Sequence, residues 1–235
     1  MNVEMHYHLT DGDPVAEKYY KDVWTTKVHL KKGYTSIYEF SWEDYYIYML
    51  VHLAKHIKLG GSGIRSIIDI KIFLDKKKEE LNWDYVKEEL KKLHLSQFEY
   101  WMRQLSEVWF GTEKTTPLYD ELTEFIVDSG TYGTIKNYHA SHVVELGGKN
   151  QNLSVGKIRS KLEIIFLPYE GMQEQYLYLE KFPFLLPVAW IQRIFRTIVW
   201  RKDKITSTLQ STNIEQDRLE KVKKVMDALE LFESD

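Results

Sequence analysis

The chain has 235 residues, of which 43% are hydrophobic and 14% aromatic, so it can bury a substantial core in one large domain or two small ones. Its 32 Lys and Arg residues against 35 Asp and Glu give a formal net charge of −3, which does not favour nucleic acid as a partner. There is no cysteine, which excludes disulfides, thiolate catalysis and cysteine-zinc sites. Without a secretory signal after Met1, the sequence predicts a cytoplasmic protein.

Residues 2–10 alternate between apolar and titratable side chains, a pattern typical of a β-strand. One face of this strand would carry Val3, Met5, Tyr7 and Leu9, and the other Glu4, His6 and His8. A lone strand leaves its backbone N–H and C=O groups unpaired, and little of the remaining sequence reads as sheet. We therefore expect a partner chain or self-association to complete an N-terminal sheet.

Residues 11–40 continue this N-terminal part. Asp11-Gly12-Asp13-Pro14 predicts a turn, residues 15–24 a short helix, and residues 27–30 with 34–40 a hairpin or extended arm. Residues 1–40 thus form a small, incomplete β element with an extended arm.

From residue 41 onward, helices dominate, so the predicted fold class is mainly α. Ser41 with Asp44, and Ser96 with Glu99, match the capping-box spacing at two helix starts. The predicted helices cover residues 41–59, a stretch starting at 64, 82–93, 96–111, 116–129, 154–166, 172–180, 187–202 and 213–232. Residues 41–235 form one helical domain with an internal boundary expected in the glycine-rich stretch 130–153, which includes a short helix at 138–146.

The segment Phe182 to Trp200 is apolar but is interrupted by prolines and by Arg193 and Arg196. A membrane-spanning helix would have to hide both arginines, so we expect no stable membrane span. The segment instead predicts a core helix that begins near Pro187, with the two arginines exposed or facing a ligand.

Polar pairs at helical spacing are the main candidates for a site in the helical part. His52 and His56 project from a common helix face, and Arg65 and Asp69 do so on the next helix. The histidines lack the HExxH pattern of zinc proteases, and both pairs have structural alternatives, hydrogen-bonded core histidines and an intrahelical salt bridge. A metal-dependent hydrolase that uses the histidines is a third, weaker hypothesis.

Three further features carry weaker signals. Glu4, His6 and His8 suit metal binding or proton exchange, or simply form a polar strand edge. Gly60-Gly61-Ser62-Gly63 before a helix is compatible with anion binding through backbone N–H groups, but it lacks the ending of a P-loop. We expect the pair His139 and His142 to lie on the surface.

The order and spacing of several motifs resemble a bacterial group of uncharacterised nucleotidyltransferases. The motifs are Val3-Glu4-Met5-His6, Leu50-Val51-His52-Leu53-Ala54-Lys55-His56 and Gly63-Ile64-Arg65-Ser66-Ile67-Ile68-Asp69-Ile70, followed by Asn82-Trp83-Asp84 and the segment from Phe182-Pro183 to Pro187. Each motif is short, so the specificity of the resemblance comes from their order along nearly the whole chain.

The resemblance implies a polymerase-β-like nucleotidyltransferase, in which carboxylates on a sheet hold Mg²⁺ ions and a nucleotidyl group moves from an NTP to an acceptor. By position, Glu4 resembles the third catalytic carboxylate and would be a metal ligand. His6 resembles the histidine beside it. The residues His52, His56, Arg65 and Asp69 would line the helical, substrate-binding side of the cleft, and residues 1–40 would include a remnant of the α+β core.

In that family a Gly-Ser-bearing helix and an Asp-x-Asp strand precede the Glu strand, and only Met1-Asn2-Val3 precede Glu4 here. We therefore expect this chain to be a largely helical, truncated or split C-terminal part that is inactive alone, with its catalytic half on another polypeptide. The alternative is a non-catalytic helical module that binds a ligand or a partner protein.

Overall fold

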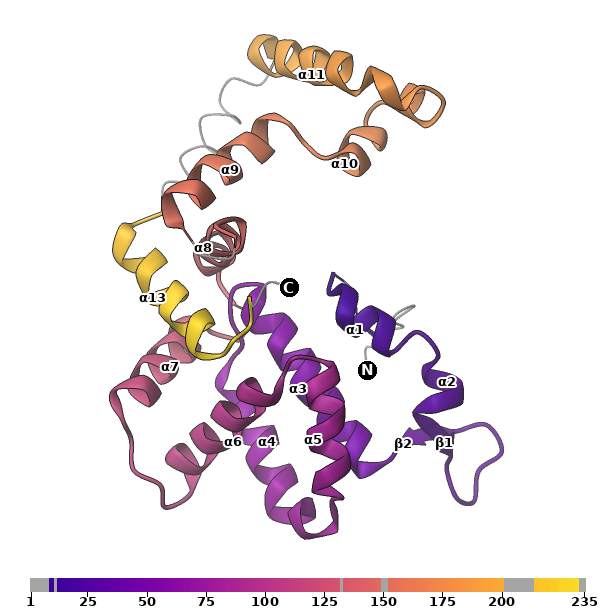
Figure 1. The fold of residues 1–235 in the computed structure, drawn as a ribbon, viewed down its shortest axis with the longest axis vertical. Coiled ribbons are helices and arrows are strands. Elements are labelled where there is room, and N and C mark those ends of the chain that lie inside the picture. Colours follow the sequence, from indigo (N-terminus) through magenta and orange to yellow (C-terminus); the bar gives the residue numbers. More distant parts are fainter. Residues whose placement is uncertain (1–8, 11, 132, 149–151, 201–213, 233–235) are drawn as a thin grey trace. The chain divides into compact units, whose positions relative to one another are not determined.

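The computed structural model describes residues 9–10, 12–131, 133–148, 152–200 and 214–232, and it is mainly α-helical (Figure 1). The described residues contain one sheet, of two strands. The chain forms two compact units, residues 1–134 with 224–233 (unit 1) and residues 135–223 with 234–235 (unit 2). No helix within the described ranges combines the length and apolar character needed to cross a membrane.

Unit 1 begins with the N-terminal arm, which contains two short helices and a hairpin. These are α1 (Pro14–Tyr19), α2 (Val23–Thr26), β1 (Val28–Leu30) and β2 (Tyr38–Phe40). The hairpin is the predicted one, antiparallel with Val28 opposite Phe40. The single helix predicted for residues 15–24 is wrong, because Tyr20 ends α1 and Asp22 starts α2.

Residues 1–8, with Glu4, His6 and most of the predicted opening strand, lie outside the described residues. Leu9 and Thr10, the described end of that stretch, are not in a strand.

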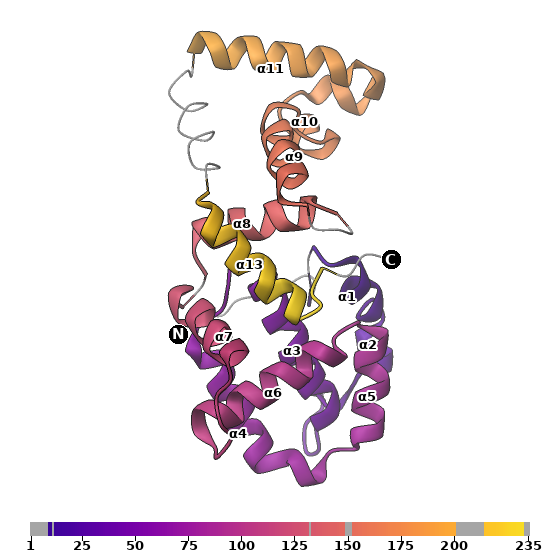
Figure 2. The same ribbon diagram turned by 60° about the vertical axis from the view of Figure 1, so that its left-hand side comes forward.

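Five helices follow the arm and form a bundle, confirming the prediction of successive helices from residue 41. They are α3 (Trp42–Lys58), α4 (Ile64–Lys77, continued by the short 3-10 helix η1, Lys78–Glu80), α5 (Trp83–Lys92), α6 (Ser96–Phe110) and α7 (Pro117–Asp128). Helices α3, α4, α5 and α6 pack on one another and lie side by side in both views (Figures 1 and 2). Their apolar stripes meet in a core that includes Tyr46, Ile47, Leu50, Ile67, Ile70, Phe98, Met102 and Leu105.

Local signals set most helix starts in this bundle. Ser41 Oγ accepts a hydrogen bond from the Asp44 N–H at 3.0 Å, and Asn82 Oδ1 accepts one from the Tyr85 N–H. The capping box predicted at Ser96 is wrong, because Leu95 occupies the N-cap position without a side-chain cap. Glu99 instead accepts hydrogen bonds from Tyr46 and Arg103.

A segment distant in sequence completes unit 1. Helix α13 (Gln216–Ala228) passes from unit 2 into unit 1 at Lys224, whose Nζ lies 2.5 Å from Glu121 Oε1 on α7. After Lys224, the side chains of Val225, Met226, Leu229 and Leu231 are buried. The apolar side chains of residues 224–232 are therefore part of the core of unit 1.

Unit 2 contains a helix pair and a smaller helical group. The pair is α8 (Ile135–Leu146) and α9 (Leu153–Ile165), and the smaller group is α10 (Tyr169–Gln173), the 3-10 helices η2 (Leu177–Glu180) and η3 (Pro183–Leu185), and α11 (Leu186–Trp200). Helix α8 begins before the predicted residue 138. The helix predicted for 172–180 is interrupted, because the chain turns after Gln173 so that Met172 and Leu179 both pack with Ala189.

The helix predicted from Pro187 is α11, but only one of its faces is in a core. Ala189 is buried, whereas Ile191 and Phe195 are largely exposed. Arg193, predicted to be exposed or facing a ligand, is half-buried and donates to the carbonyls of Ile164 and Ile165. The predicted core helix is therefore confirmed for its inner face, and Arg196 is exposed as predicted, whereas the prediction is wrong for Arg193.

Candidate functional site

The predicted histidine pair lies on α3, one turn from the end of the helix. His52 Nε2 and His56 Nε2 are 2.9 Å apart, and the two rings meet edge to face. At this distance one nitrogen donates a proton and the other accepts it, so the two Nε2 atoms do not both carry a proton. Burial, together with the nearby charge of Lys55, lowers the pKa of His56. The lowered pKa favours the uncharged form of His56.

The predicted Arg65 and Asp69 pair lies on α4. Arg65 Nε and Asp69 Oδ2 are 3.8 Å apart, and the Arg65 side chain is 90% exposed. A pair this exposed contributes little to stability, about 0–1 kcal/mol. Arg65 is therefore available for a negatively charged ligand at small cost to the fold.

The structure places each predicted pair within its own helix, and the glycine-rich turn of residues 60–63 joins the two helices. All four residues of this turn are buried. Gly61 has φ +115°, and a Cβ there would overlap the Ser129 side chain. Residues 129–131, which follow α7, pack against this turn. They occupy the space that the anion suggested by the sequence would need.

The described residues contain no group of three or more His, Asp or Glu that could hold a metal ion. Glu4, the Mg²⁺ ligand implied by the resemblance, lies outside the described residues. Asp13, the described aspartate of the Asp11-Gly12-Asp13 sequence, caps α1 and pairs with Lys58 at 2.9 Å. The residues that the structure describes therefore do not by themselves fit the magnesium site of a transferase.

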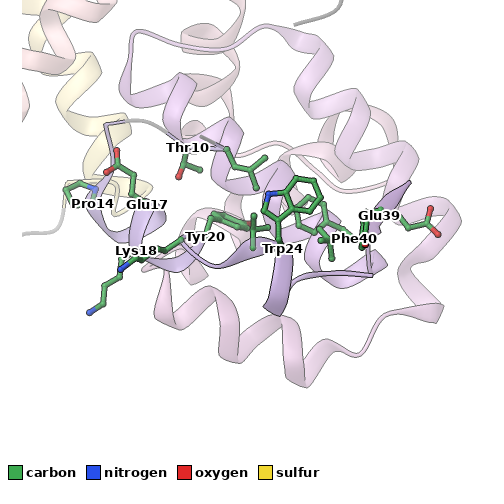
Figure 3. Close-up of a pocket in the computed structure, with 13 residues that line it drawn as sticks. Thr10, Pro14, Glu17, Lys18, Tyr20, Trp24, Glu39 and Phe40 are labelled. Atoms are coloured by element: carbon green, nitrogen blue, oxygen red, sulfur yellow. The ribbon is translucent and has the colours of Figure 1, made fainter. Parts of the chain in front are cut away.

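A cavity of about 1020 Å³ lies along the N-terminal arm, and we call it the arm cavity (Figure 3). It is lined by Leu9, Thr10, Pro14, Glu17, Lys18, Tyr20, Lys21, Val23, Trp24, Val28, Tyr38, Glu39 and Phe40. Figure 3 shows Tyr20, Trp24 and Phe40 close together, with Lys18 extending away from them. None of the sequence-predicted site residues that the structure describes lines this cavity.

Two aromatic residues give the arm cavity its chemical character. Trp24 is 71% exposed and meets the Tyr38 ring edge to face. Tyr20 is only 5% exposed, and its hydroxyl has no hydrogen-bond partner in the part of the chain that the structure describes. The exposed indole suits a ligand with a flat apolar part, whereas the Tyr20 hydroxyl is buried and does not face the solvent.

A second polar cluster joins the arm to the bundle, and sequence reasoning missed it. Lys27 Nζ donates to Tyr19, Tyr85 and Glu89 at 2.7–2.9 Å and lies 3.4 Å from Asp44 Oδ1. We call these five residues the Lys27 cluster. Burial opposes the charge of Lys27, but its hydrogen bonds outweigh burial and raise its pKa. No sequence motif marks the cluster, because its members come from the arm, α3 and α5.

His139 and His142, predicted to lie on the surface, are half-buried on α8. His142 Nε2 lies 2.7 Å from Glu163 Oε2 of α9, and Nδ1 lies 3.9 Å from Glu145 Oε2. The contacts with Glu145 and Glu163 raise the pKa of His142. Both histidines thus remain partly exposed, on a helix, and His142 also forms part of the contact between α8 and α9.

Comparison with protein families finds one match, over residues 1–111, to the family described as "Uncharacterised nucleotidyltransferase". The matched range includes the arm, α3, α4 and α5, and therefore both predicted pairs. Residues 1–111 are therefore similar to this nucleotidyltransferase family. Comparison with curated proteins and with solved structures gave no match.

Proposed function

We propose that this chain carries the largely helical side of a nucleotidyltransferase cleft, and that the protein serves NTP-dependent transfer of a nucleotidyl group to an acceptor. The match of residues 1–111 to the nucleotidyltransferase family supports the proposal, because it spans Glu4, His6 and both pairs on adjacent helices. In this reading Glu4 is the catalytic carboxylate and Mg²⁺ ligand, and His6 binds substrate beside it.

In this proposal the helical residues bind substrate and perform no bond-making step. The exposed Arg65 meets the triphosphate of the NTP, and Asp69 holds the guanidinium in position through the contact at 3.8 Å. His52 and His56 hydrogen-bond the substrate, and the lowered pKa of His56 favours its uncharged ring.

A binding measurement tests this assignment. NTP affinity, measured by calorimetry with Mg²⁺ for each of the four common NTPs, is expected to fall about tenfold or more in Arg65→Ala, as for loss of one charge-assisted hydrogen bond. Lys76→Ala is the matched control, since Lys76 is an exposed cation on the same helix. Equal affinities of the two variants and the wild type would remove Arg65 from the site.

We also propose that these 235 residues do not transfer nucleotide by themselves. Apart from Asp11-Gly12-Asp13, whose Asp13 carboxylate is engaged by the cap of α1 and by Lys58, the sequence offers no Asp-x-Asp to accompany Glu4. The purified chain, incubated with labelled NTP, Mg²⁺ and candidate acceptors, is expected to give no labelled product. Labelling that disappears in Glu4→Gln would overturn this expectation.

The second candidate is a non-catalytic helical module that binds a small ligand or a peptide. The arm cavity favours it, because this cavity has exposed aromatic surface and lies apart from the two predicted pairs. A thermal-shift screen with nucleotides and short peptides separates the candidates. Stabilisation lost in Trp24→Ala but kept in Arg65→Ala supports the module, and the opposite pattern supports the transferase cleft.

A further proposal concerns association through the N-terminal sheet. The hairpin β1–β2 has only two strands, and its Leu30, Ile37 and Tyr38 side chains are exposed. We propose that a partner chain or a second copy extends this incomplete sheet, in the cytoplasm that the cysteine-free composition favours. Light scattering of the wild type and of the double variant Leu30→Lys/Tyr38→Lys, which places charge on the exposed hairpin, tests it. An unchanged oligomeric state would contradict association through this hairpin.

A further inference from the structure

One face of α11 and the preceding η3 is apolar and exposed. Phe184, Val188, Ile191 and Phe195 recur at intervals of four, three and four residues, which places them on one side of a helix. Phe184 is 75%, Ile191 67% and Phe195 70% exposed. We call these four residues the α11 face. Exposed apolar residues gathered in this way are typical of an interaction surface.

The opposite side of α11 is packed, so the exposure does not come from an unattached helix. Ala189 is buried with Met172 and Leu179, and Trp190 packs against this small core. Trp190 Nε1 also donates to the Leu167 carbonyl at 2.8 Å. The inner side thus holds the helix in place, while the α11 face points outward.

The charged residues of the α11 segment itself are all basic, and exposed carboxylates lie just before it, at Glu174 and Glu180. The net charge of the whole chain is −3, yet every charged residue from Lys181 to Lys202 is basic: Lys181, Arg193, Arg196, Arg201 and Lys202. Among the described ones, Lys181 and Arg196 are exposed. Arg196 lies beside the α11 face on the helix, with its guanidinium 5.5 Å from the centre of the Tyr176 ring. Arg193 is turned inward, towards the end of α9.

We propose that the α11 face binds the surface of an anionic lipid bilayer, with α11 lying in the interface. Phe184, Ile191 and Phe195 enter the boundary between headgroups and acyl chains, and Lys181 and Arg196 contact lipid phosphates. An interfacial helix needs no membrane-spanning length, which agrees with the lack of a spanning helix in the described residues.

Charge complementarity favours the bilayer over a second copy of the chain. Two α11 faces brought together would place basic segments against each other without a carboxylate from residues 181–202 to neutralise them. An anionic bilayer offers both an apolar interior and phosphates at the depth of the cations. The proposal is independent of the nucleotidyltransferase assignment, because it uses no residue of the family match at 1–111.

Vesicle co-sedimentation of the full chain tests the proposal. The wild type is expected to sediment with phosphatidylcholine vesicles containing about one third phosphatidylglycerol, and much less with pure phosphatidylcholine. The double variant Ile191→Glu/Phe195→Glu is expected to bind the anionic vesicles about tenfold or more weakly, since it removes buried apolar area and adds negative charge.

The matched control is Ile135→Glu, a change of the same kind at the start of α8, where Ile135 is 76% exposed. It is expected to bind like the wild type, and circular dichroism checks that each variant is folded. The absence of wild-type binding to anionic vesicles overturns the proposal. An equal loss of vesicle binding in Ile135→Glu also overturns it. So does a wild type that forms a dimer without binding vesicles, if the double variant abolishes that dimer and Ile135→Glu does not.

Discussion

At the scale of single residues, the Lys27 cluster is a largely buried polar contact between the arm and the bundle. Lys27 and Asp44 side chains are 10% exposed and Glu89 is 8% exposed, so the charges are mostly shielded from water. Tyr19 adds a 2.5 Å hydrogen bond to Glu89, and Tyr85 one of 2.8 Å to Asp44. Buried charges of this kind depend on every partner being present.

Replacing Lys27 by Met is therefore expected to lower the free energy of unfolding by about 3–5 kcal/mol, because Glu89 and Asp44 lose their shared cation inside the protein. Urea unfolding followed by circular dichroism measures the change. The control is Lys31→Met, which breaks a 2.9 Å pair with Glu39 whose side chains are both more than 40% exposed. Because this pair is exposed to solvent, its loss is expected to have a far smaller effect, and equal effects of the two changes would contradict the buried role of Lys27.

The same cluster predicts a loss of stability in acid. Burial alone would raise the pKa of Glu89, but hydrogen bonds from Lys27, Lys92 and Tyr19 outweigh it and lower the pKa to about 2. Because the folded pKa lies below the ordinary value of 4.5, this stabilisation is present above pH 4.5 and is lost as the pH falls towards 2.

Between those pH values the free energy of unfolding is expected to fall by about 2–3 kcal/mol through Glu89 alone. Urea unfolding at a series of pH values measures the slope for the wild type and for Glu89→Gln. The variant is expected to be less stable at pH 6 and to have a flatter dependence below pH 4.5. An unchanged slope would show that other carboxyl groups account for the acid sensitivity.

At the scale of elements, the pairing of α8 and α9 depends on one glycine. A Cβ at Gly156 would overlap the Val143 carbonyl oxygen, so the two helices approach more closely than any larger residue allows. His142 and Glu163 meet across the same helix pair. Neither contact was predicted, because a glycine inside a helix does not reveal which helix approaches it.

Gly156→Ala is therefore expected to destabilise the protein by about 1–3 kcal/mol, although alanine is the better helix former by about 1 kcal/mol. Gly171→Ala in α10 is the control, since a Cβ there meets nothing within 4 Å, and it is expected to be neutral or stabilising. Thermal unfolding of both variants measures the difference. A stabilised Gly156→Ala variant would contradict the close approach.

Elements with a local cause were predictable from the sequence, and contacts between distant residues were not. Ser41, Asn82 and Pro117 each begin a helix as predicted, because a cap or a proline acts within one turn. The capping pattern at Ser96 misled, since Glu99 is held by Tyr46, 53 residues away. Lys27 and Glu89 are 62 residues apart, and no pattern in the sequence connects them.

In the candidate site too, contacts within one helix were predictable from the sequence, and surroundings made by distant residues were not. The spacing of His52 and His56, and of Arg65 and Asp69, indicates a contact within one helix, and both contacts are present. The arm cavity was not predicted, because Tyr20 and Trp24 acquire their surroundings from the folding of the arm beside the hairpin. Whether the two pairs bind substrate stays a prediction.

At the scale of the whole molecule, unit 1 is larger than the range matched by the nucleotidyltransferase family. The match ends at residue 111, whereas unit 1 also contains α7 and residues 224–233. Met226 and Leu229 in that last segment are fully buried. A fragment of residues 1–111 therefore lacks part of the core of unit 1.

Met226→Ala is accordingly expected to lower the free energy of unfolding by about 2–5 kcal/mol, the range for truncating a buried large side chain. Chemical unfolding measures the loss. The control is Ile72→Ala, because Ile72 on α4 of the same unit is 48% exposed and is expected to cost less than half as much. A Met226→Ala variant as stable as the wild type would show that residues 224–232 do not support unit 1.

The burial of residues 224–232 in unit 1 also has a consequence for biosynthesis. A ribosome makes the arm and the bundle first, then all of residues 135–223, before the side chains that complete unit 1 emerge. Until then the nascent unit exposes the apolar surface that Val225, Met226 and Leu229 later cover. Contacts between residues so far apart in sequence also slow folding. Unit 1, although it begins the chain, is thus expected to be the last part to finish folding and the part that most needs a chaperone during translation.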